Sequence, residues 1–130
     1  MSGNEFEEFF ETYAERYMAS DADAITAMYE APFLAVREGR AIHLVDRDAV
    51  REHLAGLMAA YRNAGATRAA IAALDVTPLG HSCALATVRW NAVADDGALV
   101  RAFATSYHML RAESGDWRIL SYTNHQDSTA

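Results

Sequence analysis

The histidine at position 53 is the side chain in this sequence best suited to acid–base chemistry. It follows Val50 by three residues and precedes Leu57 by four, so on a helix it borders an apolar stripe. An imidazole at the edge of a buried surface can act as a general acid or base, because its pKa lies near neutral pH. The alternative is a half-buried histidine that bonds only a carbonyl group or water.

Three tyrosines and one arginine could complete a ligand site. Tyr13, Tyr107 and Tyr122 could each donate a hydrogen bond to a carbonyl or phenolate oxygen of a ligand. The alternative for them is core packing with the hydroxyl satisfied locally. Arg37 could bind a ligand carboxylate, or it could be an exposed residue of a hairpin.

Other chemistries find little support in the sequence. The five histidines form no pair two or four residues apart, and Cys83 is the single cysteine. We therefore predict no metal site and no cofactor. Phosphate-binding loops, serine nucleophile motifs and dinucleotide-binding fingerprints are absent from the sequence.

The length, composition and charge of the chain exclude several classes of protein and partner. The chain has 130 residues, enough for one domain, and 52% of them are apolar. The net charge of −7 argues against nucleic acid and against an anionic membrane surface as partners. A single cysteine, no signal-like N-terminus and no membrane-spanning run predict a cytoplasmic protein.

The first half of the chain carries the helical patterns that would position these residues. Phe6, Phe10, Tyr13 and Tyr17 recur at helical spacing, with glutamates on the other faces. Pro32 prevents a second helix from continuing. The predicted elements are a helix over 5–19, a short helix capped by Ser20, a hairpin over Phe33–Arg37 and Arg40–Leu44, and a helix from Asp46 to Gly65.

The second half carries strand patterns. Residues 67–79 mix helix-favouring alanines with β-branched residues, and we interpret them as a strand. Strands over 81–93, 99–111 and 117–126 follow, and the Asp96-Gly97 pair predicts a hairpin turn between the first two. This order predicts an α+β fold, a curved antiparallel sheet with three N-terminal helices on one face.

Several runs resemble the nuclear transport factor 2-like superfamily, which includes ketosteroid isomerase, scytalone dehydratase and SnoaL-type polyketide cyclases. The runs are SDADAITAMY (20–29), DAVREHL (48–54), DVTPLG (75–80) and GDWRI (115–119). The resemblance covers nearly the whole chain and implies a single SnoaL-like domain over 1–130. It also implies a cone-shaped sheet of the cystatin-like type, with a pocket between the helices and the concave face.

The alternation of side chains along the strands predicts which residues line that pocket. Turns at Asp96-Gly97 and Ser114-Gly115 pair Trp90 with Phe103 and Tyr107 with Tyr122. The face that we place inside contains Ala84, Ala86, Val88, Trp90, Phe103, Thr105, Tyr107, Met109, Leu120, Tyr122 and Asn124. The expected ligand-binding residues are Trp90, Phe103, Tyr122, Asn124 and Arg37, and the expected catalytic residues are His53, Tyr13 and Tyr107.

The resemblance limits the reaction. Tyr13 matches the oxyanion-stabilising tyrosine of ketosteroid isomerases, but Arg37 and Tyr107 stand where those enzymes carry a carboxylate base and a protonated acid. Because arginine cannot act as a base near neutral pH, steroid isomerisation is disfavoured. The resemblance implies a protein that binds a small apolar or aromatic ligand in the cone, with a cofactor-independent lyase, isomerase or cyclase activity as one option. The alternative is a non-catalytic dimeric module with a filled core.

The other sheet face predicts a partner. It would contain Leu85, Leu110, Trp117 and Ile119, which are too apolar to leave in water. We therefore expect a homodimer formed through the convex sheet face, with Leu110, Trp117 and Ile119 near the contact.

Overall fold

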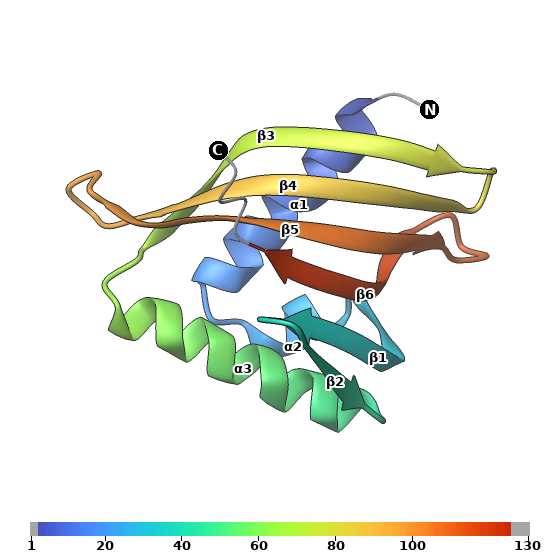
Figure 1. Ribbon diagram of the computed structural model, residues 1–130, viewed down its shortest axis with the longest axis horizontal. Coiled ribbons are helices and arrows are strands. Elements are labelled where there is room, and N and C mark those ends of the chain that lie inside the picture. Colours follow the sequence, from blue (N-terminus) through green and yellow to red (C-terminus); the bar gives the residue numbers. More distant parts are fainter. Residues whose placement is uncertain (1–2, 126–130) are drawn as a thin grey trace.

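The computed structural model describes residues 3–125, and the side chains of residues 5–125 (Figure 1). Its elements are α1 (Gly3–Met18), α2 (Ala22–Thr26), β1 (Tyr29–Arg37), β2 (Arg40–Leu44), α3 (Arg47–Asn63), β3 (Arg68–Leu79), β4 (Cys83–Val93), β5 (Leu99–Arg111) and β6 (Trp117–His125). The α+β order predicted from the sequence is confirmed, including the strand over 67–79. The predicted strand end at Gln126 lies outside the described residues.

Six strands form one curved sheet in the order β2-β1-β6-β5-β4-β3. The neighbouring pairs are antiparallel except β1 and β6, which run parallel. The sheet is therefore mixed rather than purely antiparallel as predicted. All three helices lie on its concave side, α1 behind the long strands and α3 along the β1–β2 end (Figure 1).

The apolar stripe of α1 supplies much of the core. Phe6 and Phe10 are completely buried, and Phe10 packs against Tyr107 of the sheet at a ring-centroid distance of 4.7 Å. Burying side chains of this size contributes about 1.5–3 kcal/mol each. The glutamates of α1 at positions 7, 8, 11 and 15 remain exposed, as the amphipathic pattern predicted.

The helix starts follow local hydrogen bonding. Asp46 caps α3 as predicted, because its carboxylate accepts from the backbone N–H of Ala49 at 2.8 Å. The predicted cap of α2 is wrong by one residue: Asp21 accepts from Ala24, while Ser20 has a φ of +58°. In this position the Ser20 hydroxyl accepts from Arg62 of α3 at 2.6 Å instead.

The predicted strand registers hold at the centre of the sheet and fail near the start of β6. Trp90 pairs with Phe103, and Tyr107 with Tyr122, as predicted. The ladder then shifts: His108 faces Ser121, but Met109 faces Ile119. One extra residue, Leu120, therefore forms a bulge in β6, and a bulge exchanges the faces of the residues beyond it.

The bulge corrects three face assignments. Ile119 is completely buried, and Trp117 packs against Phe6 of α1 at a ring distance of 4.9 Å, so both lie on the concave side. Leu120, placed inside from the sequence, is only partly buried and lies on the other side. Trp117 and Ile119 therefore cannot line a contact on the convex face.

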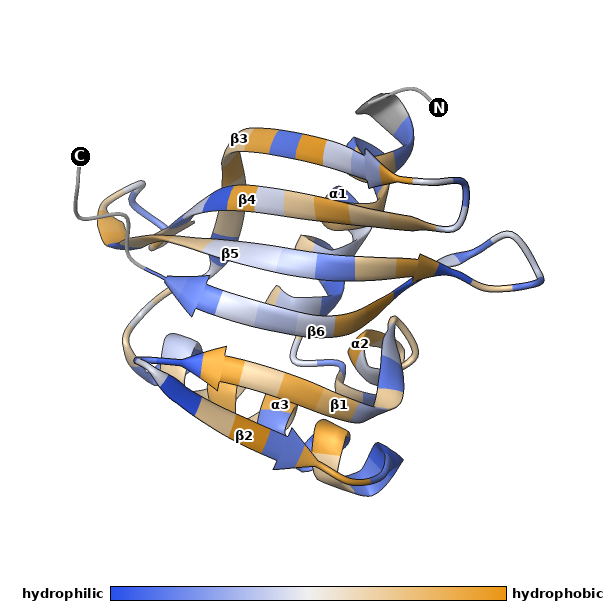
Figure 2. Cartoon of the chain, turned by 45° about the vertical axis from the view of Figure 1, so that its right-hand side comes forward, coloured by the Kyte–Doolittle hydropathy of each residue, from blue (hydrophilic) through white to orange (hydrophobic). Residues whose placement is uncertain are grey.

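The convex face itself is mixed in character. Figure 2 shows the helices behind the sheet, with hydrophilic and hydrophobic residues interspersed along the strands. Its apolar members include Leu85, which is 42% exposed, and the partly buried Leu110. Beside them Thr87, Ser106 and His125 form a hydrogen-bonded row, with distances of 2.8 and 3.0 Å.

Within the described residues, none of the helices combines the length and the apolar character needed to cross a membrane.

Candidate functional site

A small cavity of about 50 Å³ lies inside the cone, between α1, α3 and the concave face of the sheet. Its walls are mostly aromatic, and small-molecule sites usually enclose about 300–1,000 Å³, so most of this cone is filled by side chains. The lining side chains that carry polar groups are Tyr13, Tyr17, Tyr29, Arg37, Tyr61, Trp90, Thr105, Tyr107, Tyr122 and Asn124.

The inner part of the cavity contains two hydrogen-bonded aromatic pairs. The hydroxyl groups of Tyr13 and Tyr29 lie 2.5 Å apart, and the Trp90 indole N–H donates to the Tyr107 hydroxyl at 3.0 Å. Burial raises the pKa of Tyr13, Tyr29 and Tyr107 above the ordinary value of 10. These phenols are therefore neutral near pH 7 and can donate a hydrogen bond to a ligand oxygen.

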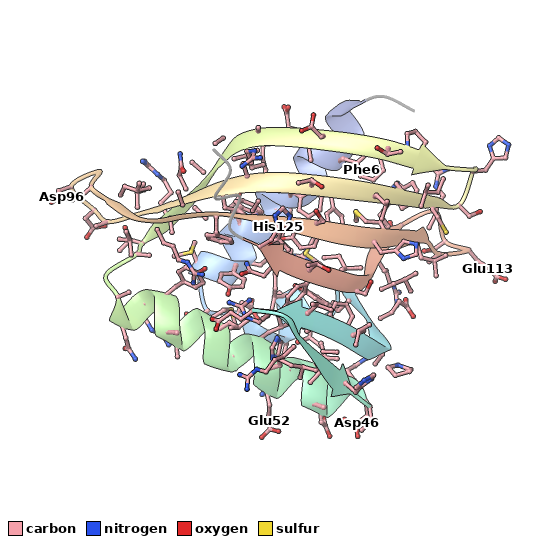
Figure 3. All side chains as sticks on the ribbon, in the orientation of Figure 1. Phe6, Asp46, Glu52, Asp96, Glu113 and His125 are labelled. Carbon is pink, nitrogen blue, oxygen red and sulfur yellow. The ribbon has the colours of Figure 1, made fainter. Side chains whose placement is uncertain are left out.

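At the other end of the cavity, three elements bring polar groups together. The Tyr122 hydroxyl on β6 lies 2.6 Å from Nε2 of His53 on α3, and Arg37 at the end of β1 donates to it at 3.5 Å. The inward position of His53 follows from helix periodicity, since its neighbour Glu52 points away from the sheet (Figure 3). This end of the cone is its polar end.

Desolvation and the charge of Arg37 determine the protonation state of His53 at this end. Desolvation, and then the positive charge of Arg37, lower the pKa of His53 below its ordinary value of 6.5, so the imidazole is neutral at pH 7. Arginine can only donate, so the Tyr122 oxygen accepts from Arg37. The direction of the Tyr122–His53 bond depends on the tautomer of the neutral ring: Tyr122 donates when the ring hydrogen is on Nδ1 and accepts when it is on Nε2.

Among the described residues, the cavity lining contains one cationic side chain and no carboxylate. Arg37 is half-buried, and within residues 5–125 it makes no ion pair with Asp or Glu. A half-buried cation without a counter-ion is a favourable place for an anionic ligand group. In the same part of the chain, no three His, Cys, Asp or Glu side chains lie close enough together to hold a metal ion.

The structure brings most of the predicted site residues together. Tyr13, Tyr107, Trp90, Phe103, Tyr122, Asn124 and Arg37 all line the cavity. His53 is not among the lining residues, and it reaches the lining through its hydrogen bond to the Tyr122 hydroxyl. The Asn124 amide is held in place by donating to Thr105 at 3.2 Å.

Three lining tyrosines were not predicted as site residues. Tyr17 stacks on Tyr13 at a ring distance of 5.8 Å, and its spacing of one helical turn from Tyr13 was an available signal. Tyr61 lies on the same apolar stripe of α3 as Leu54 and Met58 and contacts Arg101 at 3.4 Å. Tyr29 begins β1 and bonds Tyr13.

A comparison with protein-family models now places the chain. The model described as "NTF2-like protein (DUF6841)" matches residues 4–127, nearly the whole sequence. The chain belongs to this family. No curated protein matches this NTF2-like chain.

Solved structures with the same fold are distant in sequence. An NTF2-like protein with a cystatin-like fold from Novosphingobium aromaticivorans is 19% identical, with a TM-score of 0.73 over 98% of this chain and 82% of that one. Aln2 from a Streptomyces species is 15% identical, with a TM-score of 0.76 over 99% and 95%. An NTF-2 like protein of unknown function from Shewanella oneidensis is 14% identical, with a TM-score of 0.72 over 95% and 98%. At these identities the likeness establishes the cystatin-like NTF2 fold and nothing finer.

Proposed function

We propose that this NTF2-like protein binds a small aromatic carboxylate in the cone, with the carboxylate on Arg37. The observation that supports this proposal is the half-buried guanidinium of Arg37, which lines the cavity and has no carboxylate partner within residues 5–125. Hydrogen bonds between a guanidinium and a carboxylate are among the strongest in proteins. The Tyr122 hydroxyl and the Asn124 amide lie in the same lining and would share the polar end of the ligand.

The aromatic walls suit a flat apolar ligand body. Tyr13 lies between Tyr17 and Trp90, with ring planes inclined by 22° and 28°. A flat ring can pack against such faces with favourable offset geometry. The neutral phenols of Tyr13 and Tyr107 would donate to an oxygen on the inner end of the ligand.

A catalytic form of this proposal uses the Tyr122–His53 pair. With the ring hydrogen on Nδ1, Nε2 of His53 can accept the Tyr122 proton while the Tyr122 oxygen takes a proton from the ligand, so that the pair acts as a general base. Such a relay would support an isomerase, lyase or cyclase reaction without a cofactor. The catalytic form requires that the wild type convert a ligand to product and that both Tyr122→Phe and His53→Gln abolish this conversion.

The alternative is a non-catalytic module with a filled core. The cavity volume of about 50 Å³ favours it, because this space holds a few water molecules and not a drug-sized ligand. The binding proposal therefore requires either a ligand of few atoms or additional space next to the cavity.

Titration calorimetry with benzoate as the probe separates the two functions. We expect benzoate to bind, and benzyl alcohol, its neutral analogue, to bind at least tenfold more weakly. Arg37→Gln should lower benzoate affinity by roughly tenfold to a hundredfold, since a charged hydrogen bond contributes about 1.5–3 kcal/mol. Arg40→Gln is the matched control, because Arg40 faces Arg37 across the hairpin but does not line the cavity. Equal binding of both probes, or equal loss in both variants, would refute the proposal.

A further inference from the structure

A second hollow lies outside the cone, between α1 and the first residues of β3. It is a groove of about 530 Å³, bounded on one side by residues of α1 from Glu11 to Ala19 and on the other by residues 67–71. This volume falls within the range of small-molecule sites, unlike the cavity of about 50 Å³ inside the cone.

Only a thin wall divides the groove from the cone cavity. Among the described residues, three line both hollows: Ala14 and Met18 on α1, and Ala69 on β3. Two of them are alanines, whose side chains fill little space. The third is a methionine, unbranched and able to adopt several rotamers, and it is only partly buried.

We propose that the groove is the outer half of the ligand site, and that Met18 is the movable wall between the two halves. The ligand class that follows is an elongated monocarboxylate, with its charged head on Arg37 and an apolar tail that passes Met18 into the groove. This inference rests on the proposed function and supplies the space that a ligand larger than a few atoms needs.

Charge and polarity determine which end of the ligand enters the groove. Glu11 and Glu15 lie on the α1 side of the groove and Arg68 on the β3 side, so its walls carry a net negative charge at neutral pH. They repel a carboxylate, which leaves Arg37 as the favourable position for it. The apolar part of the groove, formed by Met18, Ala69 and Ile71, suits a hydrocarbon tail.

A series of probes with one head and growing tails tests this geometry. Titration calorimetry with benzoate, 4-butylbenzoate and 4-hexylbenzoate should give an affinity that rises about fourfold for each added methylene. In Ile71→Trp, at a position that lines the groove and not the cone cavity, the indole fills the groove, so benzoate affinity stays within threefold and the gain with tail length disappears. Thr77→Trp is the matched control, because Thr77 is exposed on the same strand and lines neither hollow.

The possible outcomes separate this inference from the proposed function. If affinity does not rise with tail length but benzoate binding still depends on Arg37, the groove is not part of the ligand site and the proposed site in the cone stands. Loss of Arg37-dependent benzoate binding overturns both. If Ile71→Trp does not fold, Ala70→Trp decides, because Ala70 is exposed and lines the groove but not the cone cavity. The affinity for 4-hexylbenzoate should fall at least threefold while benzoate is unaffected, and equal effects on both probes refute the inference.

Discussion

The hydroxyl of Tyr122 and Nε2 of His53 lie 2.6 Å apart, although 69 residues separate them in the chain. Tyr122 is on the central strand β6 and His53 on the helix that covers one end of the sheet. Arg37, from the end of β1, donates to the same hydroxyl. The polar end of the cone is therefore assembled from three elements. A substitution of one of these three residues should change a measurable property of the other two.

The titration of His53 should reveal the neighbouring charge. We expect the imidazole to titrate below pH 6.5 in the NMR spectrum, because desolvation and Arg37 both disfavour its charged form. Arg37→Gln should move the midpoint upward. A wild-type midpoint at or above 6.5 would contradict the proposed environment.

The same shift makes the folded state sensitive to acid. The pKa of His53 is lower in the folded than in the unfolded chain, so the unfolded chain binds more protons below pH 6.5. The free energy of unfolding should therefore fall as the pH drops from 6.5 toward the folded pKa, and the contribution is fully present above 6.5. Urea unfolding of wild type and His53→Gln between pH 7.5 and 5 measures this contribution of His53 to the free energy of unfolding. Wild type should lose more stability than His53→Gln over this interval.

The Tyr122–His53 hydrogen bond should show as an energetic coupling. Tyr122→Phe leaves the imidazole without its partner and should cost about 1–2 kcal/mol of stability. Combined with His53→Gln, it should give an interaction energy of roughly 0.5–3 kcal/mol in a double-mutant cycle. The exposed His43 provides the control, since His43→Gln with Tyr122→Phe should be additive.

The bulge in β6 predicts opposite outcomes for two adjacent residues. Ile119→Ala should cost about 2–5 kcal/mol, because the side chain is completely buried. Leu120→Ala should cost about 1 kcal/mol or less, since Leu120 is only partly buried on the other face. Urea denaturation of the two variants decides this, and a larger loss for Leu120 would return the strand to its predicted register.

The homodimer stays a prediction, with a different set of contact residues. Leu85 and Leu110 are the apolar side chains left on the convex face beside the Thr87–Ser106–His125 row. In analytical ultracentrifugation at micromolar concentration, we expect the wild type to be a dimer and the double variant Leu85→Glu, Leu110→Glu to be a monomer. Leu99→Glu, at an exposed site near the end of the β4–β5 hairpin, serves as the control. A wild type that is monomeric at this concentration would show that the prediction is wrong.

Steroid isomerisation should be absent. Of the residues that the structure describes, none in the cavity lining is Asp or Glu, and Glu38, the carboxylate next to Arg37, is exposed in the hairpin turn. The site therefore lacks a carboxylate to take the proton that moves in that reaction. A spectrophotometric assay with a Δ5-3-ketosteroid should show no saturable, enzyme-dependent conversion, and any such conversion would require a different base.

The sequence predicted those features that depend on local pattern. The stripe of Phe6 and Phe10 and the Asp46 cap are local. The predicted pairing of Trp90 with Phe103 is correct, although the Ala94 N–H bonds the Ala98 carbonyl across a loop longer than two residues, because a register shift between Ala92 and Val93 compensates. The bulge at Leu120 was not predictable, because it reflects the packing of Trp117 on α1, which alternation cannot show.

For the candidate site, alternation placed Tyr107, Trp90 and Tyr122 on one face correctly. It could not show that His53 would bond Tyr122 and lie outside the cavity lining, since that depends on the distance between a helix and a strand far apart in sequence. It also missed Tyr29, whose bond to Tyr13 exists only because the chain enters a strand at that residue.

The parallel pairing of β1 with β6 sets the order in which the molecule can be completed. During synthesis the hairpin of β1 and β2 leaves the ribosome long before β6, its other neighbour in the sheet of the described residues, exists. Contacts between such distant segments form late, after the entropy of closing a long loop has been overcome. Until β6 arrives, the edge of β1 that will bind it is exposed, and with it the end of the cone that carries Arg37. A nascent chain that stalls before residue 117 therefore presents an unpaired strand edge, the kind of surface that chaperones bind and that promotes aggregation.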